Sequence, residues 1–376
     1  MPYIDSKMHR NLKVFNVVGA RPNFMKIAPI TSCMRESYNI TPVLVHTGQH
    51  YDENLSKIFF DDLDLPKPDI NLNVGSGSQA VQTAGIMINF EKLCESEKPD
   101  MVLVVGDVNS TLACSLVAAK LCIPVAHVEA GLRSRDRSMP EEINRIVTDA
   151  ISDYLFTTSK DADANLLAEG IPRESIFFVG NVMVDTLLKH RDQAVKLNFL
   201  KNINCKIKEA GYALVTLHRQ SNVDDRETLA KIVDAIEYIQ NQLTVIFPVH
   251  PRTKKQLQKF GLDRGLATLK GLVLLEPLGY LDFLSVMSGA RVVLTDSGGL
   301  QEETTVLGIP CLTIRENTER PVTVSMGTNQ LVGTDCGRII SAVEKILKGN
   351  DIRGRIPELW DGRAAQRIVD IIGKQV

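Results

Sequence analysis

The sequence lacks most of the features that mark secreted, membrane-bound or nucleic-acid-binding proteins. Its seven cysteines are odd in number and never occur as Cys-x-x-Cys, which argues against a disulfide framework and a structural zinc site. No apolar run approaches the roughly 20 residues that a membrane-spanning helix requires. We therefore expect a reduced, cytoplasmic protein that needs neither a metal nor a cofactor.

A strong excess of charge of either sign is also absent. The net charge is -2, from 43 basic and 45 acidic residues. This balance offers no electrostatic basis for a nucleic-acid or membrane partner. Residues 1–11 are polar and contain no hydrophobic segment of the kind that forms a signal peptide, so we expect them to be a disordered leader.

What the chain does contain is a regular alternation of short apolar runs and helical patterns. A chain of 376 residues exceeds the length at which a single core usually splits, so we expect two domains. Short β-branched runs bounded by turn residues are typical of buried parallel strands. The expected strands are Leu12–Val18, Thr41–His46, Met101–Gly106, Ile123–Val128, Tyr154–Thr157, Ile176–Val179, Ala213–Leu217, Thr244–Pro248, Leu272–Leu275, Val292–Thr295 and Pro310–Thr313. Their alternation with helices predicts an α/β fold of doubly wound parallel sheets.

The domain boundary is expected where this rhythm breaks. After Gly180 a helical pattern leads into a lysine- and asparagine-rich connection, and strands resume at Ala213. We therefore predict an N-terminal Rossmann-like domain over 12–183 and a C-terminal one over 184–361. The amphipathic helical tail, 362–376, is expected to pack back on the first domain.

Four of the expected strands end directly in polar residues. These ends are Asp107, Glu129, His218 and the turn Asp296-Ser297-Gly298-Gly299. In open α/β sheets, ligands bind beyond the carboxyl ends of the strands. Carboxylates, a histidine and a glycine turn at those ends therefore predict a site for acid–base chemistry on an anionic ligand. Asp107 has an alternative role as a cap of the helix at Ser110.

Two strand-to-helix turns are suited to phosphate, because a helix N-terminus offers free N–H groups and the positive end of a dipole. The first is Gly19-Ala20-Arg21-Pro22, where Arg21 and Lys26 add positive charge. The second is the turn at 296–299, with Ser297 and backbone N–H groups as donors and Glu303 placed to accept ribose hydroxyls. Capping of the helix by Asp296 or Ser297 is compatible with this interpretation.

Three further residues complete the candidate set. Glu141 begins a helix, where the dipole alone would favour a carboxylate. His250 ends the strand that follows the one at His218, and a strand-end histidine often only packs. Arg320 lies in the charged loop 315–321 and is a candidate diphosphate ligand.

Together these motifs resemble the non-hydrolysing UDP-N-acetylglucosamine 2-epimerases, from about Lys13 to about Ile372. The motifs that carry the resemblance are Gly-Ala-Arg-Pro at 19–22, Gly-Asp at 106–107, His-Val-Glu-Ala-Gly-Leu-Arg at 127–133, Pro-Glu-Glu-Ile-Asn-Arg at 140–145, His-Arg at 218–219 and Asp-Ser-Gly-Gly-Leu-Gln-Glu-Glu at 296–303. The resemblance implies two Rossmann-like domains in the glycosyltransferase-B architecture, with the active site in the interdomain cleft. It also implies a homodimer and a UDP-sugar substrate.

The resemblance assigns roles to individual residues. The implied catalytic residues are Asp107, Glu129, Glu141 and His218. The implied UDP-sugar contacts are Arg21, Lys26, Phe283, Ser297, Gly298, Gly299, Glu303 and Arg320, to which the position of His250 adds a further candidate.

The implied reaction is reversible epimerisation of UDP-GlcNAc to UDP-ManNAc at C2. UDP is eliminated to give a 2-acetamidoglucal and is then added back, which supplies N-acetylmannosamine units for surface polysaccharides. Alternatives are a C2 epimerase of a UDP-diacetamido-uronic acid, a hydrolysing UDP-GlcNAc 2-epimerase, a glycosyltransferase and a non-catalytic binding protein.

The chain also departs from the family pattern. It has Gln49-His50-Tyr51-Asp52-Glu53 and His218-Arg219-Gln220-Ser221-Asn222 where many members have Gln-His-x-x-Met and His-Arg-Arg-Glu. An arginine of the family's regulatory substrate site is replaced within Gly75–Ser78, so we do not expect activation by the substrate.

Overall fold

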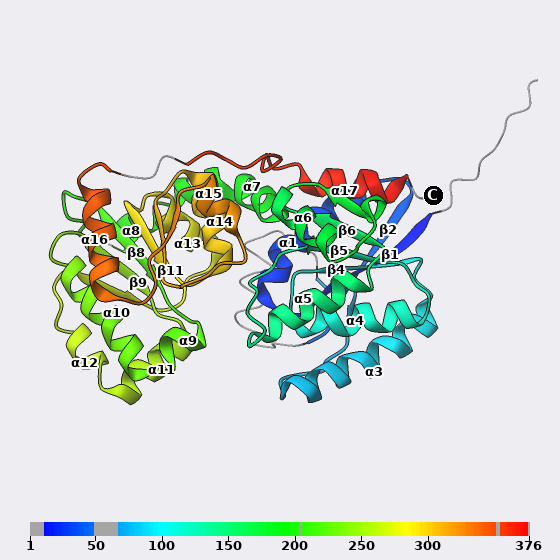
Figure 1. Cartoon of the computed structure of the whole chain (residues 1–376), viewed down its shortest axis with the longest axis horizontal. Helices are drawn as coiled ribbons and strands as arrows, with labels where there is room; N and C mark the ends of the chain where they lie inside the picture. Colours follow the sequence, from blue (N-terminus) through cyan, green and yellow to red (C-terminus); the bar gives the residue numbers. More distant parts are fainter. Residues whose placement is uncertain (1–10, 49–66, 204, 351–353, 375–376) are drawn as a thin grey trace, which may run out of the picture. The chain divides into compact units, whose positions relative to one another are not determined.

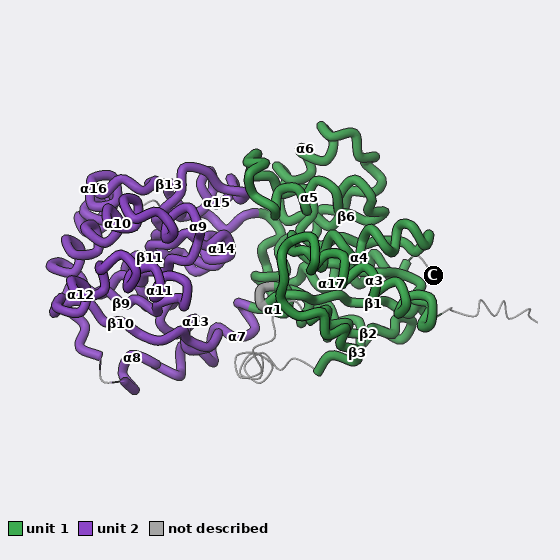
Figure 2. Tube along the Cα trace, turned by 90° about the horizontal axis from the view of Figure 1, so that it is seen from below, with its two compact units in different colours: residues 1–186, 358–376 green, residues 187–357 purple. Residues whose placement is uncertain are grey.

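The computed structural model describes residues 11–48, 67–203, 205–350 and 354–374, and the chain forms two compact units (Figure 2). Residues 1–10 of the expected leader and the turn at 49–53 lie outside the described residues. Unit 1 comprises residues 1–186 and 358–376, and unit 2 comprises residues 187–357. The chain therefore passes from one unit to the other twice, first within helix α7 (Val182–Leu197) and again after Pro357.

Unit 1 contains a seven-stranded parallel sheet in the order β3-β2-β1-β4-β5-β6-β7. Its strands are β1 (Leu12–Val18), β2 (Ile40–His46), β3 (Ile70–Asn71), β4 (Met101–Val105), β5 (Val125–Ala130), β6 (Tyr154–Thr157) and β7 (Ile176–Phe178). Its helices are α1 (Arg21–Glu36), α3 (Gln79–Glu97), α4 (Asn109–Lys120), α5 (Pro140–Ala150), α6 (Lys160–Ala168), the 3-10 turn η1 (Arg173–Ser175) and α17 (Ala364–Gly373). Helices α3, α4 and α5 lie side by side on one face, and α1 and α17 cover the other (Figure 1).

Unit 2 contains a six-stranded parallel sheet in the order β10-β9-β8-β11-β12-β13. Its strands are β8 (Tyr212–Thr216), β9 (Thr244–Pro248), β10 (Leu272–Leu275), β11 (Val292–Thr295), β12 (Cys311–Thr313) and β13 (Asn329–Leu331). Its helices are α8 (Phe199–Asn202), α9 (Gln220–Val223), α10 (Arg226–Ile239), α11 (Pro251–Phe260), α12 (Asp263–Leu266), α13 (Tyr280–Ser288), α14 (Gly298–Leu307), α15 (Pro321–Ser325) and α16 (Cys336–Leu347).

The apolar pattern explains both sheets. All five residues of β4 are buried, as expected of a strand covered by helices on both faces. Helix α3 buries Gln82, Ile86, Phe90 and Cys94, which recur every four residues and so lie on one helical face. Within the described part of the chain, no helix combines the length and the apolar character needed to cross a bilayer.

Every strand expected from the sequence is present, so the prediction of an α/β fold with two doubly wound sheets is confirmed. The prediction omitted β3 and β13, which are edge strands of two and three residues. Such short segments carry too little periodicity to be distinguished from loops. In each sheet the chain order reverses beside the first strand, between β1 and β4 and between β8 and β11, which is where ligands bind in folds of this type.

One strand end was placed wrongly. We expected a strand to stop at Val128, but β5 continues to Ala130 and contains Glu129. Glu129 has a left-handed backbone with φ of 71°, and the pairing of β5 with β6 shifts register between Val128 and Ala130. This register shift therefore changes the direction of the Glu129 side chain without ending the strand.

Hydrogen bonds hold the C-terminal segment against unit 1 close to the two points where the chain passes between the units. The Asp185 carboxylate accepts backbone N–H groups of Ala364 (3.2 Å) and Ala365 (2.7 Å) at the start of α17. The Trp360 indole donates to the carbonyl of Thr158 at 2.8 Å. The compact units are bounded after 186 and 357, and the sequence rhythm predicted domain boundaries after 183 and 361.

Burial of Asp185 makes the stability of this attachment pH-dependent. Burial, with a smaller contribution from Asp361, raises the pKa of Asp185 to about 6 against the opposing effect of the two N–H groups and Arg367. Because the folded protein binds this proton more tightly than the unfolded chain does, protonation of Asp185 stabilises the fold. This contribution is complete below the unfolded-state pKa of about 3.9 and is lost as the pH rises through 6. Between pH 4 and pH 7 we expect Asp185→Asn to gain stability relative to the wild type by on the order of 2–3 kcal/mol.

Urea unfolding followed through Trp360, the single tryptophan, measures this difference within unit 1. A constant difference between variant and wild type across that pH range would contradict the prediction.

Candidate functional site

The first turn of α1 is bonded to the end of β4. The Asn23 side chain donates to the carbonyl of Val105 at 2.6 Å and accepts from the backbone N–H of Ala20 at 3.2 Å. Arg21 is the first residue of α1. The helix N-terminus is thereby fixed beside the point where the strand order reverses.

Glu129 and Lys26 form a buried ion pair at the same sheet edge. Lys26 is 8% exposed and Glu129 3% exposed, and the ammonium contacts the carboxylate directly. A Cβ atom on Gly106 would lie 3.3 Å from the Glu129 carboxylate and 3.4 Å from both the Lys26 ammonium and the Asn23 amide. Gly106, whose φ is +72°, therefore leaves the space in which these three polar groups meet.

Asp107 follows β4 and pairs with Arg145 of α5. Arg145 also holds Glu142 through Nε (3.0 Å) and Nη2 (2.8 Å), and Glu142 accepts the backbone N–H groups of Ser134 and Arg135, each at 2.9 Å. Burial alone would raise the pKa of Glu142, but these N–H groups and the guanidinium together lower it. Glu142 thus anchors Arg145, and Arg145 orients the Asp107 carboxylate.

The neighbouring carboxylates differ in exposure. Glu141, the second residue of α5, is exposed, whereas Glu142 is 1% exposed. The Asp107 side chain is 31% exposed, and the N-cap of α4 is Val108, so the capping role considered for Asp107 is not observed. Asp107 and Glu141 are therefore accessible to a ligand, and Glu142 is an internal support.

A buried network beneath β5 was not found from the sequence. His127 contacts Asp149 through Nδ1 (2.6 Å) and the carbonyl of Gly106 through Nε2 (2.8 Å). Asp149 also pairs with Arg133 at 2.7 Å and accepts the Gly131 N–H at 3.1 Å. His127 and Arg133 stood in a motif, but Asp149 lies among ordinary helical residues and gave no signal.

In unit 2, His218 and Asp296 meet between the ends of β8 and β11. Asp296 is fully buried, and its Oδ1 lies 2.8 Å from Nδ1 of His218, whose side chain is 42% exposed. The ring of His250 lies 5.7 Å from that of His218 between centroids, and His250 accepts the N–H of Arg252 at 3.2 Å as the N-cap of α11. His250 is therefore exposed, caps α11 and contacts the ring of His218.

The glycine turn opens α14 as expected. Ser297 is its N-cap, and Gly298 and Gly299 are its first two residues. A Cβ atom on Gly298 would lie 2.6 Å from Nη1 of Arg320, so only glycine admits the guanidinium this close. A helix N-terminus and an arginine therefore lie together at this edge.

Glu319 gathers three arginines around one buried carboxylate. Arg219 lies 2.9 Å, Arg315 2.8 Å and Arg320 3.8 Å from its oxygens, and Arg320 also pairs with Glu302 at 2.9 Å. Burial would raise the pKa of Glu319, but Arg320, Arg219 and Arg315 hold it far below its usual range. Arg320 was predicted from this loop as a diphosphate ligand, but Glu319 was not recognised.

Glu303 of α14 contacts Tyr280 of α13. Glu303 is 4% exposed, and Tyr280 donates its hydroxyl to Oε1 at 3.1 Å. Burial raises the pKa of Glu303 to about 8, against the effect of Tyr280 and with a further increase from Glu302. Glu303 is therefore largely protonated at neutral pH. Phe283, one turn from Tyr280 on α13, is half-buried.

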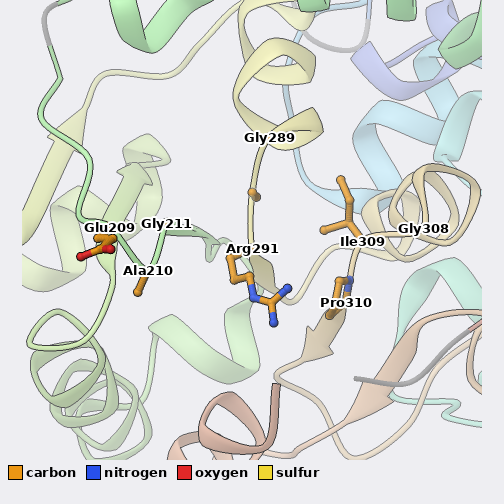
Figure 3. A pocket seen from close by; sticks show the side chains of 9 residues that line it. Glu209, Ala210, Gly211, Gly289, Arg291, Gly308, Ile309 and Pro310 are labelled. Atoms are coloured by element: carbon orange, nitrogen blue, oxygen red, sulfur yellow. The ribbon is translucent and has the colours of Figure 1, made fainter. Parts of the chain in front are cut away.

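The hollow shown in Figure 3 lies at the amino ends of the unit 2 strands, opposite the ends that carry His218 and Asp296. Its volume is about 360 Å³. Its lining residues, Glu209–Gly211, Gly289–Arg291 and Gly308–Pro310, precede β8, β11 and β12. It therefore does not include His218, Asp296 or the glycine turn. Among the described residues, no cluster of histidine, cysteine and acidic side chains is arranged to hold a metal ion.

Known proteins match the chain over nearly its whole length. The family model for UDP-N-acetylglucosamine 2-epimerase matches residues 32–373. The chain is 48% identical over 364 residues to UDP-N-acetylglucosamine 2-epimerase of Methanocaldococcus jannaschii, with 96% of this chain and 99% of that protein covered. It is 39% identical to UDP-2,3-diacetamido-2,3-dideoxy-D-glucuronate 2-epimerase of Pseudomonas aeruginosa, with 96% and 100% covered.

Solved structures match equally well. The M. jannaschii UDP-GlcNAc 2-epimerase in complex with UDP-GlcNAc and UDP has a TM-score of 0.89 at 46% identity, with 96% of this chain and 100% of that chain covered. The Neisseria meningitidis UDP-GlcNAc 2-epimerase bound to UDP-GlcNAc has a TM-score of 0.88 at 31% identity, with the same coverage.

The two Rossmann-like sheets and these structural matches define an epimerase of the glycosyltransferase-B type, with carboxylates at one sheet edge and a helix N-terminus at the other. The chain belongs to the UDP-N-acetylglucosamine 2-epimerase family.

The Glu319 cluster predicts a large loss of stability when its anion is removed. In Glu319→Gln three buried or half-buried arginines lose the charge that compensates them, and breaking a buried ion pair from one side costs about 3–5 kcal/mol. We expect the free energy of unfolding, from urea titration followed by circular dichroism, to fall by about that amount. Glu276→Gln, which breaks the exposed pair with Lys254, should leave it unchanged, and an equally small effect of both substitutions would contradict the prediction.

Proposed function

We propose that the chain interconverts UDP-N-acetylglucosamine and UDP-N-acetylmannosamine without hydrolysis, and so supplies N-acetylmannosamine units for surface polysaccharides. The observation that carries the proposal is the set of carboxylates at the β4 and β5 ends, where Lys26 holds Glu129 and Arg145 holds Asp107. Membership of the 2-epimerase family supports the substrate, because relatives are crystallised with UDP-GlcNAc and UDP.

The sugar chemistry needs acid–base groups on both faces of C2. No carbonyl adjoins C2, so simple deprotonation would give an unstabilised carbanion. Loss of UDP from C1 as the C2 proton leaves gives a neutral 2-acetamidoglucal, and UDP then returns to C1 as C2 is protonated on the opposite face. Asp107, Glu129 and Glu141 share the proton transfers in this proposal. Their different exposures and partners give them different environments for the two directions of the reaction.

The departing UDP needs stabilisation as negative charge develops on its diphosphate. The N-terminus of α14 offers backbone N–H groups at Gly298 and Gly299, with Ser297 as a further donor. Arg320 and His218 supply positive charge, and Arg21 and Lys26 act from the start of α1. In this proposal Glu303 accepts a hydrogen bond from a ribose hydroxyl, and Phe283 contacts the uracil.

Proton exchange at C2 tests the proposed reaction directly. The purified protein with UDP-N-acetylglucosamine in D2O should produce UDP-N-acetylmannosamine that carries deuterium at C2, as seen by proton NMR. Accumulation of free UDP with free N-acetylmannosamine would instead establish a hydrolysing enzyme.

Removal of either supported carboxylate should stop the exchange. We expect Asp107→Asn and Glu129→Gln each to lower kcat by roughly 10²- to 10⁴-fold, the usual range for a general acid or base. Glu97→Gln, which alters an exposed carboxylate paired with Lys13 in the same unit, is the matched control and should retain wild-type turnover. Retention of C2 exchange in both active-site variants would exclude these carboxylates as the acid–base groups.

A second substrate is supported by the P. aeruginosa relative, which is named for a UDP-diacetamido-uronate and is covered along its entire length. If that sugar is the substrate here, kcat/KM for it should exceed that for UDP-N-acetylglucosamine by at least about tenfold. Parallel assays with the two UDP-sugars measure the ratio.

A further inference from the structure

Asp296 binds several N–H donors with one buried carboxylate. Its Oδ2 accepts the backbone N–H groups of His218 and Arg219, each at 3.0 Å, and the side-chain amide of Asn222 at 3.2 Å. Its Oδ1 lies 2.8 Å from Nδ1 of His218 and 3.2 Å from the backbone N–H of the same residue. Asp296 therefore fixes both the backbone and the imidazole of His218.

The contact determines which ring nitrogen carries the proton. An ionised carboxylate only accepts hydrogen bonds, so Nδ1 of His218 must be protonated to approach it at 2.8 Å. Burial would raise the pKa of Asp296, but His218 and the backbone N–H groups lower it, so the carboxylate remains charged. In the neutral ring Nε2 is then the unprotonated nitrogen, and in the charged ring Nε2 carries the additional proton.

We infer that Asp296 is a positioning residue that fixes the Nδ1–H form of His218, directs Nε2 toward the substrate and stabilises the imidazolium. This inference deepens the proposed function, on which it rests. In the charged ring, Nε2–H donates a hydrogen bond to an oxygen of the departing diphosphate, and the buried Asp296 carboxylate balances the charge of the ring. Asp296 itself does not contact the substrate.

The geometry predicts a specific failure in Asp296→Asn. The three donors at Oδ2 require an oxygen there, so the amide nitrogen must take the place of Oδ1 and face Nδ1 of His218. An amide NH2 group donates, so Nδ1 becomes the acceptor and the ring proton moves to Nε2. The variant thus retains the contacts made at Oδ2 and loses the weaker backbone contact of His218 at Oδ1. It holds the imidazole in the opposite tautomer and without a compensating anion.

The tautomer can be read without any assay of turnover. Long-range ¹H–¹⁵N NMR of ¹⁵N-histidine-labelled protein near pH 8.5, with His218 assigned through His218→Gln, should show Nδ1–H in the wild type and Nε2–H in Asp296→Asn. An Nε2–H ring in the wild type would overturn the inference even if the enzyme were fully active.

Turnover provides the second test. We expect Asp296→Asn to lower kcat roughly 100-fold or more while KM changes less than about threefold, since positioning of a catalytic histidine acts mainly on the transition state. Combining it with His218→Gln should give no loss beyond that of His218→Gln alone, because Asp296 acts through His218. Fully additive losses would overturn the inference.

Asp225→Asn is the matched control, because Asp225 caps α10 in the same unit by accepting the Thr228 N–H at 2.8 Å. It should retain wild-type kcat and the wild-type tautomer of His218, and a shift of either in this control would overturn the specific role of Asp296. Wild-type protein that shows Nδ1–H but neither binds nor converts a UDP-sugar would refute the proposed function, while the structural part of the inference would stand.

Discussion

The buried carboxylates at the strand ends are the constraint on which the rest of the structure depends. Moving a charge out of water is costly unless an opposite charge and hydrogen bonds replace the solvent. Glu129 has Lys26, Glu319 has three arginines, and Asp296 has backbone N–H groups and His218. Each replacement also fixes the position of a cation, so the acids determine where the positive charges of the site lie.

Backbone geometry serves the same purpose at two places. The left-handed conformation of Glu129 is unusual for a residue with a side chain and persists only where its surroundings enforce it. The missing side chain of Gly106 leaves the room that this carboxylate occupies beside Lys26. At α14, Gly298 similarly admits the guanidinium of Arg320. In both units, therefore, a glycine leaves the room that an ionic group occupies near the end of a parallel strand.

Strands and strand-end residues were predictable because they depend on local information. Buried parallel strands are continuous apolar runs, and the residue after each run is necessarily at the edge of the sheet. The sequence therefore identified Asp107 and His218 correctly as edge residues. It placed the end of β5 before Glu129 because a register shift depends on pairing with β6, which no pattern in β5 itself records.

The partners of these residues were less predictable, since they come from distant segments. Asp296 was interpretable as a helix cap, yet its donors lie in the turn after β8 and in helix α9, 74 to 78 positions earlier in the chain. Glu303 was selected for its position one turn into α14, but spacing did not predict its contact with Tyr280 or the burial that raises its pKa to about 8. Burial and pairing of this kind arise from tertiary packing, which spacing alone does not encode.

The two units use the same strand order but handle their acids differently. Unit 1 leaves Asp107 and Glu141 accessible, which suits groups that exchange protons with a ligand. Unit 2 encloses Asp296, Glu302 and Glu319 and pairs each with a cationic side chain or a histidine that it orients. A buried acid occupies only one side of the cation that it pairs with. The N–H groups on the other side of that cation are therefore left to face a ligand. An anionic leaving group then meets pre-oriented donors, and little reorganisation is needed as its charge develops.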